Sequence, residues 1–111
     1  MQNLRNSVSL IGRVGKDPET KSFNSGTRVA FSVATTEIFR KNNGEKVEDT
    51  QWHNIIIWGK LADIAGRYLR KGSEVAIEGR LTHRVYETKE GKKRYVTEVN
   101  ANELVMLGGG K

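Results

Sequence analysis

Side chains that could catalyse a reaction or bind a metal are few and are scattered along the sequence. His53 and His83 are the only histidines, there is no cysteine, and no second histidine follows either at the spacing of a metal-binding motif. The segment 12–16, GRVGK, is too short for a phosphate-binding loop and lacks its Ser or Thr. Three aspartates fall on separate expected elements: Asp17, Asp49 and Asp63. We therefore expect no catalytic residue, no metal site and no cofactor.

Aromatic side chains interleaved with positive charges form a second pattern, which is typical of binding. An exposed aromatic ring can stack on an unpaired base, and a neighbouring Lys or Arg can neutralise a phosphate. Every base has a π-face, so such a surface recognises single-stranded nucleic acid rather than a particular sequence. The pattern comprises Phe39, Trp52, Trp58 and Tyr86, with Arg40, Lys41, Lys60, Arg80 and Arg84 beside them.

The charge balance favours the same kind of partner. The 111 residues include 19 Lys and Arg against 13 Asp and Glu, which gives a formal net charge of +6. A basic domain of this size fits an anionic partner, and nucleic acid is the commonest one. A basic protein without such a partner is the alternative, because charge alone does not identify a ligand.

The two tryptophans lie on one predicted strand, residues 50–58. Side chains alternate along a strand, so Trp52 and Trp58 share a face, and Ile55 and Ile57 share the opposite face with His53. The isoleucine face suits a core, which leaves the tryptophan face for a ligand. Burial of both tryptophans in the core is the alternative.

This strand leads directly into a predicted helix, and the stretch 50–72 organises the rest of the chain. Gly59 ends the strand pattern, and apolar residues then recur at helical spacing up to Tyr68 and Leu69, which we expect in the core. Gly72 stands where a left-handed helix cap is expected. The histidines should be satisfied in the core or at a subunit contact.

Four further segments complete the predicted fold. Residues 6–14, 27–37, 73–87 and 94–107 are expected strands, joined by loops at 15–27, 40–49 and 88–93. Gly79 predicts a bend or bulge, and an irregularity is expected near residues 100–102. The order favours an all-β fold with one short helix: an OB-fold, a five-stranded Greek-key barrel with the helix between strands 3 and 4. A small α+β roll is the alternative.

The composition limits the domain organisation and the compartment. Hydrophobic residues make up 36% of the chain, which leaves room for oligomerisation. The absence of cysteine excludes disulfides, and no apolar run approaches the roughly 18 residues of a membrane span. We expect one domain over residues 1–107, a flexible glycine-rich stub at 108–111, and a cytoplasmic protein without membrane contact.

Several strings resemble the family of bacterial single-stranded DNA-binding proteins. The resemblance is carried by residues 6–19, 29–35 and above all 48–72, with the strings QWHNIIIWGKLADIA, YLRKGSEVAIEGRL and RYVTEVNANELVMLGG. It covers residues 4–109. It implies a homotetrameric OB-fold, a dimer of dimers in which the first strands pair between subunits, that binds and protects single-stranded DNA in replication, recombination and repair at the nucleoid.

The resemblance also implies roles for individual residues. It implies stacking on Phe39, Trp52, Trp58 and Tyr86, and phosphate contacts from Lys60, Lys71, Arg84 and Arg94. Phe39, Trp58 and Tyr86 stand where the best-known family pattern has Trp, Phe and Trp, so stacking is expected to survive with a different strength at each of these positions. His53 corresponds to a histidine near a subunit contact.

One departure concerns the C-terminus, where family members continue into a long tail that ends in a short acidic peptide. That peptide recruits replication and repair proteins, so this chain is expected to bind DNA without recruiting them, and they would be partners only where such a tail is present. A tail-less primosomal replication protein, typically a dimer with the same barrel, is the runner-up. A nucleic-acid-processing enzyme and a purely structural β-domain are the weaker alternatives.

Overall fold

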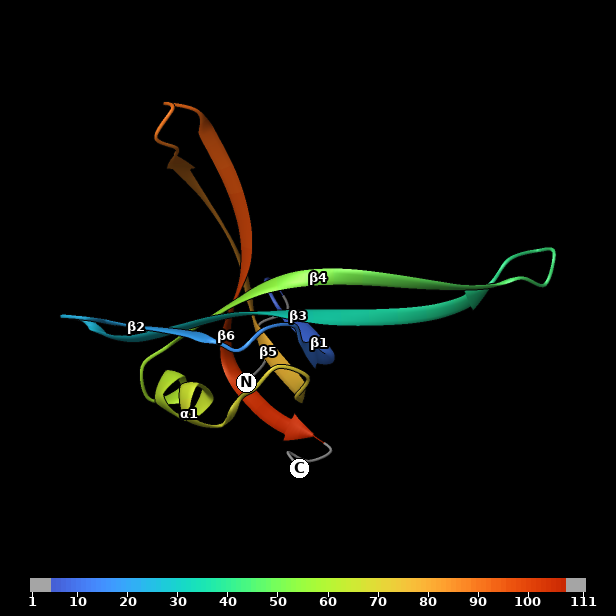
Figure 1. Ribbon diagram of the computed structural model, residues 1–111, viewed down its shortest axis with the longest axis horizontal. Coiled ribbons are helices and arrows are strands. Elements are labelled where there is room, and N and C mark those ends of the chain that lie inside the picture. The colour runs from blue at the N-terminus through green and yellow to red at the C-terminus, as the bar shows by residue number, and fades with distance from the viewer. Residues whose placement is uncertain (1–4, 108–111) are drawn as a thin grey trace.

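The computed structural model describes residues 5–107, so the expected stub at 108–111 and the first four residues of the expected domain lie outside the described part. One helix and six strands follow one another along the chain (Figure 1). They are β1 (Val8–Val14), β2 (Glu19–Phe23), β3 (Gly26–Arg40), β4 (Lys46–Trp58), α1 (Lys60–Tyr68), β5 (Glu74–Glu87) and β6 (Lys93–Leu107).

Five of the strands close into a barrel. The sheet order is β1-β5-β6-β4-β3-β2, and an additional pairing of β1 with β3 joins its two sides. That closing contact is short, Arg13 opposite Ala34 and Val14 opposite Val33. All pairs are antiparallel except β4 with β6. The expected five-stranded OB-fold barrel is confirmed. The helix α1 follows β4, which is the third strand of the barrel because β2 lies outside it.

The core lies inside this barrel and is closed at one end by α1. Alternate residues of β3, β4 and β5 point inward, as the period of a strand requires. Together with residues of the other strands and of the helix segment, they form one core cluster whose members are each at most 8% exposed: Val14, Val29, Phe31, Val33, Ile55, Ile57, Ala62, Ala65, Leu69, Val75, Ile77, Val99 and Ala101. The prediction that Ile55 and Ile57 face the core is therefore confirmed.

Strand β2 was expected to be part of a loop, and this expectation is wrong. Its five residues, ETKSF, are all exposed, so the sequence shows no alternating apolar pattern that would indicate a buried face. The strand exists because its backbone pairs with β3, from Glu19 opposite Ala30 to Phe23 opposite Gly26. Backbone pairing of this kind leaves no hydrophobic signal in the sequence.

Much of the expected loop at 40–49 is also strand. β3 and β4 continue past the barrel as a two-stranded ribbon, whose turn runs from Lys41 to Glu45 and contains Gly44 at a φ of 87°. A second ribbon, formed by β5 and β6, projects in another direction (Figure 1). Leu81 and Val85, which the pattern places with the core residues of their strand, are exposed because they lie on this ribbon.

The end of the helix differs from the expected glycine cap. α1 ends at Tyr68, and Leu69 follows with an extended backbone. Gly72 does have a positive φ of 89°, but it lies in the next turn and donates its N–H to the Val14 carbonyl over 2.8 Å. Leu69 is buried as expected, whereas Tyr68 is exposed.

Both expected irregularities in the long strands are confirmed, and they oppose each other. The register of β5 against β6 shifts between Glu78 and Gly79, where the pairing passes from Glu103 to Ala101 and leaves Asn102 without a partner residue. Gly79 lies so close to Asn100 and Ala101 that a Cβ atom would meet their backbone. The bulge bends the sheet where the ribbon leaves the barrel.

We predict that Gly79→Ala destabilises the fold by about 1–3 kcal/mol, because the added methyl group meets backbone that cannot move aside. Urea unfolding at one fixed protein concentration measures the effect. Ser22→Ala, on exposed β2, is the control and should leave the midpoint unchanged. An unchanged midpoint for Gly79→Ala would show that the bulge accommodates a side chain.

Candidate nucleic-acid interface

The outer face of β3 and β4 carries both tryptophans. Trp52 is 61% exposed and Trp58 is 44% exposed, whereas Ile55 and Ile57 between them are fully buried. The expectation that the tryptophans lie outside the core is confirmed. Six residues of extended strand separate them by about 20 Å, so the two rings mark the ends of one strand face.

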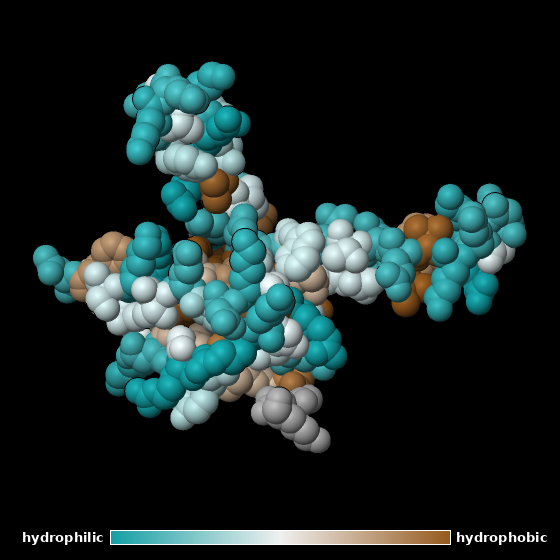
Figure 2. Space-filling view, in the orientation of Figure 1, coloured by the Kyte–Doolittle hydropathy of each residue, from teal (hydrophilic) through white to brown (hydrophobic). Residues whose placement is uncertain are grey.

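A groove runs between this face and the base of the β5–β6 ribbon. It contains two adjoining cavities of about 350 and 320 Å³. Residues that line both are Arg28 and Ile56 from the β3–β4 face, and Arg84 and Glu98 from the ribbon. Figure 2 shows hydrophobic surface partway along each projecting ribbon, flanked by hydrophilic side chains. The groove itself is lined by both apolar and charged side chains.

Trp52 is held in place by a glycine. The backbone of Gly15, whose N–H donates to the Ser32 carbonyl over 2.9 Å, lies against the six-membered ring of Trp52. A Cβ at Gly15 would meet this ring and the Ser32 hydroxyl. Together with Lys16, these residues line a further cavity of about 280 Å³. An exposed aromatic surface with a lysine beside it suits a stacked base and its phosphate.

Trp58 has an aromatic neighbour on β2. The ring of Phe23 lies 5.7 Å from the ring of Trp58 at an angle of 43°, and the Arg28 guanidinium lies 5.4 Å from the centre of Phe23. Phe23 lies in a segment that was expected to be a loop, and the sequence did not indicate Arg28. Only the register of β2, β3 and β4 brings the two residues beside Trp58.

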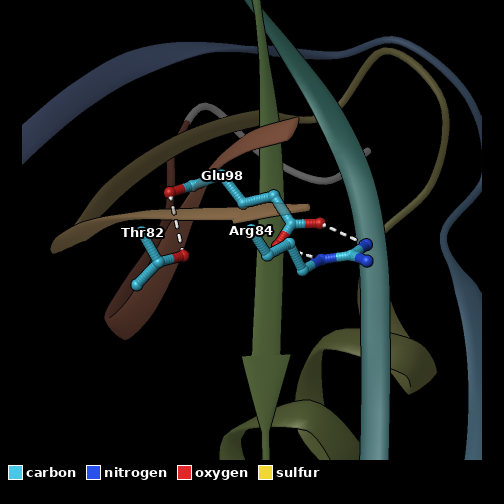
Figure 3. A network of polar contacts seen from close by, with 3 residues as sticks. All are labelled: Thr82, Arg84 and Glu98. Atoms are coloured by element: carbon cyan, nitrogen blue, oxygen red, sulfur yellow. Dashed lines mark hydrogen bonds and ion pairs between the residues drawn. The ribbon is translucent and has the colours of Figure 1, made fainter. Parts of the chain in front are cut away.

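Arg84, an expected phosphate contact, is paired with a carboxylate of its own ribbon (Figure 3). Its Nε and Nη2 donate to the two oxygens of Glu98 over 3.1 and 2.9 Å. Glu98 is only 8% exposed, and the Thr82 hydroxyl donates to its backbone carbonyl. The hydrogen bonds and the negative charge of Glu98 raise the pKa of Arg84 above its ordinary value. The pair adds almost no net charge to the groove.

The other expected residues lie around the groove at different distances. Tyr86, opposite Arg94, lies on the ribbon face that carries Arg84, with the Arg84 guanidinium 5.9 Å from its ring. Lys60 begins α1 two residues after Trp58, and the backbone N–H of Lys71 donates to Asp17, which lines the groove.

Phe39 lies apart from the groove. It is exposed, far out on the β3–β4 ribbon and opposite Val47. The alternation along β3 places it on the side that continues the inner face of the barrel, not on the side of Trp52. A strand of nucleic acid would have to pass around the ribbon to reach both rings.

Both histidines have threonine partners. His53 Nε2 lies 2.9 Å from the Thr35 hydroxyl, and His83 Nδ1 lies 2.9 Å from the Thr97 hydroxyl. Within residues 5–107 no three His, Asp or Glu side chains come together as metal ligands. No helix in the described range has the length and apolar character needed to cross a membrane.

The closed barrel and the groove on its strand face define an OB-fold protein, a class that binds oligonucleotides or oligosaccharides on this face. Within that class the chain belongs to the single-strand binding protein family, whose family model matches residues 5–107. The single-stranded DNA-binding protein of Neisseria meningitidis serogroup A is 50% identical over 105 residues, which are 94% of this chain and 60% of the relative. Single-stranded DNA-binding protein 1 of Xylella fastidiosa is 46% identical over 93% of this chain and 77% of its own length.

Two solved structures share the fold. The Plasmodium falciparum SSB complex with ssDNA matches with a TM-score of 0.86 and 33% identity, over 97% of this chain and 98% of that one. A deletion mutant of the single-stranded DNA binding protein from Thermus aquaticus matches with a TM-score of 0.81 and 28% identity, over 94% and 51%. The chain spans about 60% of the length of the Neisseria relative.

We predict that the Arg84–Glu98 pair stabilises the fold by about 1 kcal/mol, because one partner is buried and the other is half exposed. A double-mutant cycle with Arg84→Ala and Glu98→Ala, measured by urea unfolding, gives the coupling energy. High salt should reduce it. A coupling energy of zero would show that the pair does not fix the ribbon.

Proposed function

We propose that the protein binds single-stranded DNA without sequence preference, and protects it in replication, recombination and repair, without catalysing a reaction. The observation that carries this proposal is the exposure of Trp52 and Trp58 at the two ends of one groove. The family of the chain, the names of its relatives and the ssDNA complex of the Plasmodium falciparum protein support it.

In this mechanism the aromatic rings bind bases and the cations bind phosphates. Trp52 and Trp58 stack bases along the groove, and Tyr86 extends the stacking onto the β5–β6 ribbon, opposite Arg94. Phe39 would stack a base after the strand has passed around the β3–β4 ribbon. Stacking tolerates every base, which explains the absence of sequence preference.

Phosphate contacts are proposed for Lys60, Lys71, Arg84 and Arg94. Arg84 uses two of its five N–H donors on Glu98, so three remain for a phosphate. Glu98 thereby holds the guanidinium in one orientation before DNA arrives, and less side-chain freedom is lost on binding.

We propose a homotetramer, a dimer of dimers in which β1 strands pair between subunits. β1 pairs with β3 only at Arg13 and Val14, which leaves most of one edge of β1 open. Ile11 is 63% exposed, and it lines a cavity of about 510 Å³ together with Val105 and other residues of β5 and β6. An open edge beside exposed apolar side chains suits a second copy of the chain.

The protein would act in the cytoplasm, at the nucleoid, as one domain over residues 1–107. Replication and repair proteins would be recruited only by a form that carries the acidic tail of the family. The length of the Neisseria relative, of which this chain spans about 60%, is in keeping with such a further segment in relatives.

We predict that poly-dT quenches the tryptophan fluorescence and that duplex DNA does not. Trp52→Ala and Trp58→Ala should each weaken poly-dT binding by about 1–3 kcal/mol, the value of one base stack. Fluorescence titrations at low and high salt measure this, and affinity should fall steeply with salt. Tyr68→Ala, an exposed ring on α1, is the control. Unquenched tryptophans in a folded protein would refute the proposal.

For the assembly, we predict that Ile11→Lys lowers the mass measured by analytical ultracentrifugation from that of a tetramer to that of a dimer or monomer. The charge would lie in the proposed interface, where its desolvation is unfavourable. Ile64→Lys, at an exposed position of α1, is the matched control and should leave the mass unchanged. A tetramer that persists with Ile11→Lys would place the interface elsewhere.

A further inference from the structure

We propose that β2 extends the DNA-binding surface beyond Trp58, with Phe23 as an additional stacking ring and Arg28 as an additional phosphate-binding residue. The inference rests on the proposed binding of single-stranded DNA. It assigns a function to the exposed strand that the sequence did not reveal, and to an arginine at the centre of the groove floor.

The strand register places these side chains on one surface. Lys21 of β2 is opposite Arg28 of β3, and Arg28 is opposite Trp58 of β4, so the three form one row across the sheet. Residues directly opposite one another point to the same side, as do residues two positions apart. Phe23 therefore shares the face of Lys21, and the face that carries Trp58 continues across β3 onto β2. Figure 1 shows β2 running alongside β3, away from the β3–β4 ribbon.

Phe23 is available for stacking. Its partner across the hairpin is Gly26, which has no side chain to cover the ring. The ring is 46% exposed and 5.7 Å from Trp58, tilted by 43°. If one base stacks on Trp58, the Phe23 ring lies within reach of the next base along the strand. Phe23 contacts Trp58 and Arg28 on the groove side of the sheet and is not one of the core residues.

The guanidinium of Arg28 lies where the groove meets β2 and has no ion-pair partner among residues 5–107. Its Nε is buried and has no hydrogen-bond acceptor, and no ion pair within residues 5–107 involves it. The guanidinium lies over the Phe23 ring, a contact that orients the plane but satisfies none of its N–H groups. A buried donor without an acceptor is unfavourable, and no carboxylate among residues 5–107 neutralises the guanidinium, so its charge is available to a phosphate.

The contrast with Arg84 identifies Arg28 as the arginine of the groove that has no carboxylate partner among residues 5–107. Both arginines line the same two cavities, but Arg84 is neutralised by Glu98. The acidic residues Asp17 and Glu19 line one of these cavities, and Asp17 is engaged by the backbone N–H of Lys71. Arg28 also has a planar guanidinium, which suits two hydrogen bonds to one phosphate.

The experiment compares poly-dT binding by the full chain and by variants of the β2 surface. Phe23→Ala and Phe23→Leu should each weaken binding about fivefold or more, because both remove a stacking ring and the leucine keeps apolar bulk. Arg28→Gln should weaken binding and reduce the slope of log K against log salt by about 0.7, the effect of one phosphate contact on a single strand. The controls on α1 are Tyr68→Ala and Arg67→Gln, an exposed ring and an exposed arginine outside the groove.

Thermal unfolding separates binding from a structural role. Arg28→Gln removes the unsatisfied Nε, so it should unfold at the same or a higher temperature than the parent while binding more weakly. A lower unfolding temperature together with an unchanged salt slope would overturn the assignment of Arg28.

Oligo-dT strands of increasing length provide the second readout. Short strands that occupy only the groove should bind the parent and Phe23→Leu equally, and the difference should emerge only for longer strands. If poly-dT quenches the parent but Phe23→Leu and Arg28→Gln match it in affinity and salt slope at every length, the β2 surface is refuted and the proposed function stands. If poly-dT does not bind the parent, the proposed function itself fails, and this inference with it.

Discussion

The two-residue period of β3 and β4 is the constraint on which the rest of the structure depends. One set of alternate residues, including Val29, Val33, Ile55 and Ile57, is fully buried and builds the barrel core. The other set is thereby turned outward and is free to carry tryptophan, arginine and serine. A shift of β4 by one residue would turn Trp58 inward and Ile55 and Ile57 outward, so folding and binding are fixed by the same register.

The electrostatics of the groove follow from the two ribbons. β5 and β6 leave the barrel at the Gly79 bulge and bring Arg84 and Glu98 opposite the outer face of β4. Since this ion pair is neutral as a whole, attraction to a phosphate chain comes from the unpaired cations around it. Trp52, Gly15 and Lys16 form one end of the surface, and Trp58 and the helix start form the other.

The barrel, the helix position and the outward tryptophans could be predicted because each leaves a periodic pattern of apolar residues. Residues 50–58 show this best, since Ile55 and Ile57 face the core and the exposed Trp52 and Trp58 lie on the opposite face of the same strand. β2 could not be predicted, because its stability comes from backbone pairing with β3 and all its side chains are exposed. The pairing of Arg84 with Glu98 joins residues 14 positions apart on two strands, and only the cross-strand register brings them together.

The exposure of all five residues of β2 separates two properties that are coupled elsewhere in the protein. A change on β4 alters the surface and the packing together, because the buried Ile55, Ile56 and Ile57 lie next to exposed residues of the same strand. On β2 every residue is exposed, so selection or design can vary its residues with little effect on folding. A barrel with such an edge strand can evolve new surface chemistry while keeping the same interior.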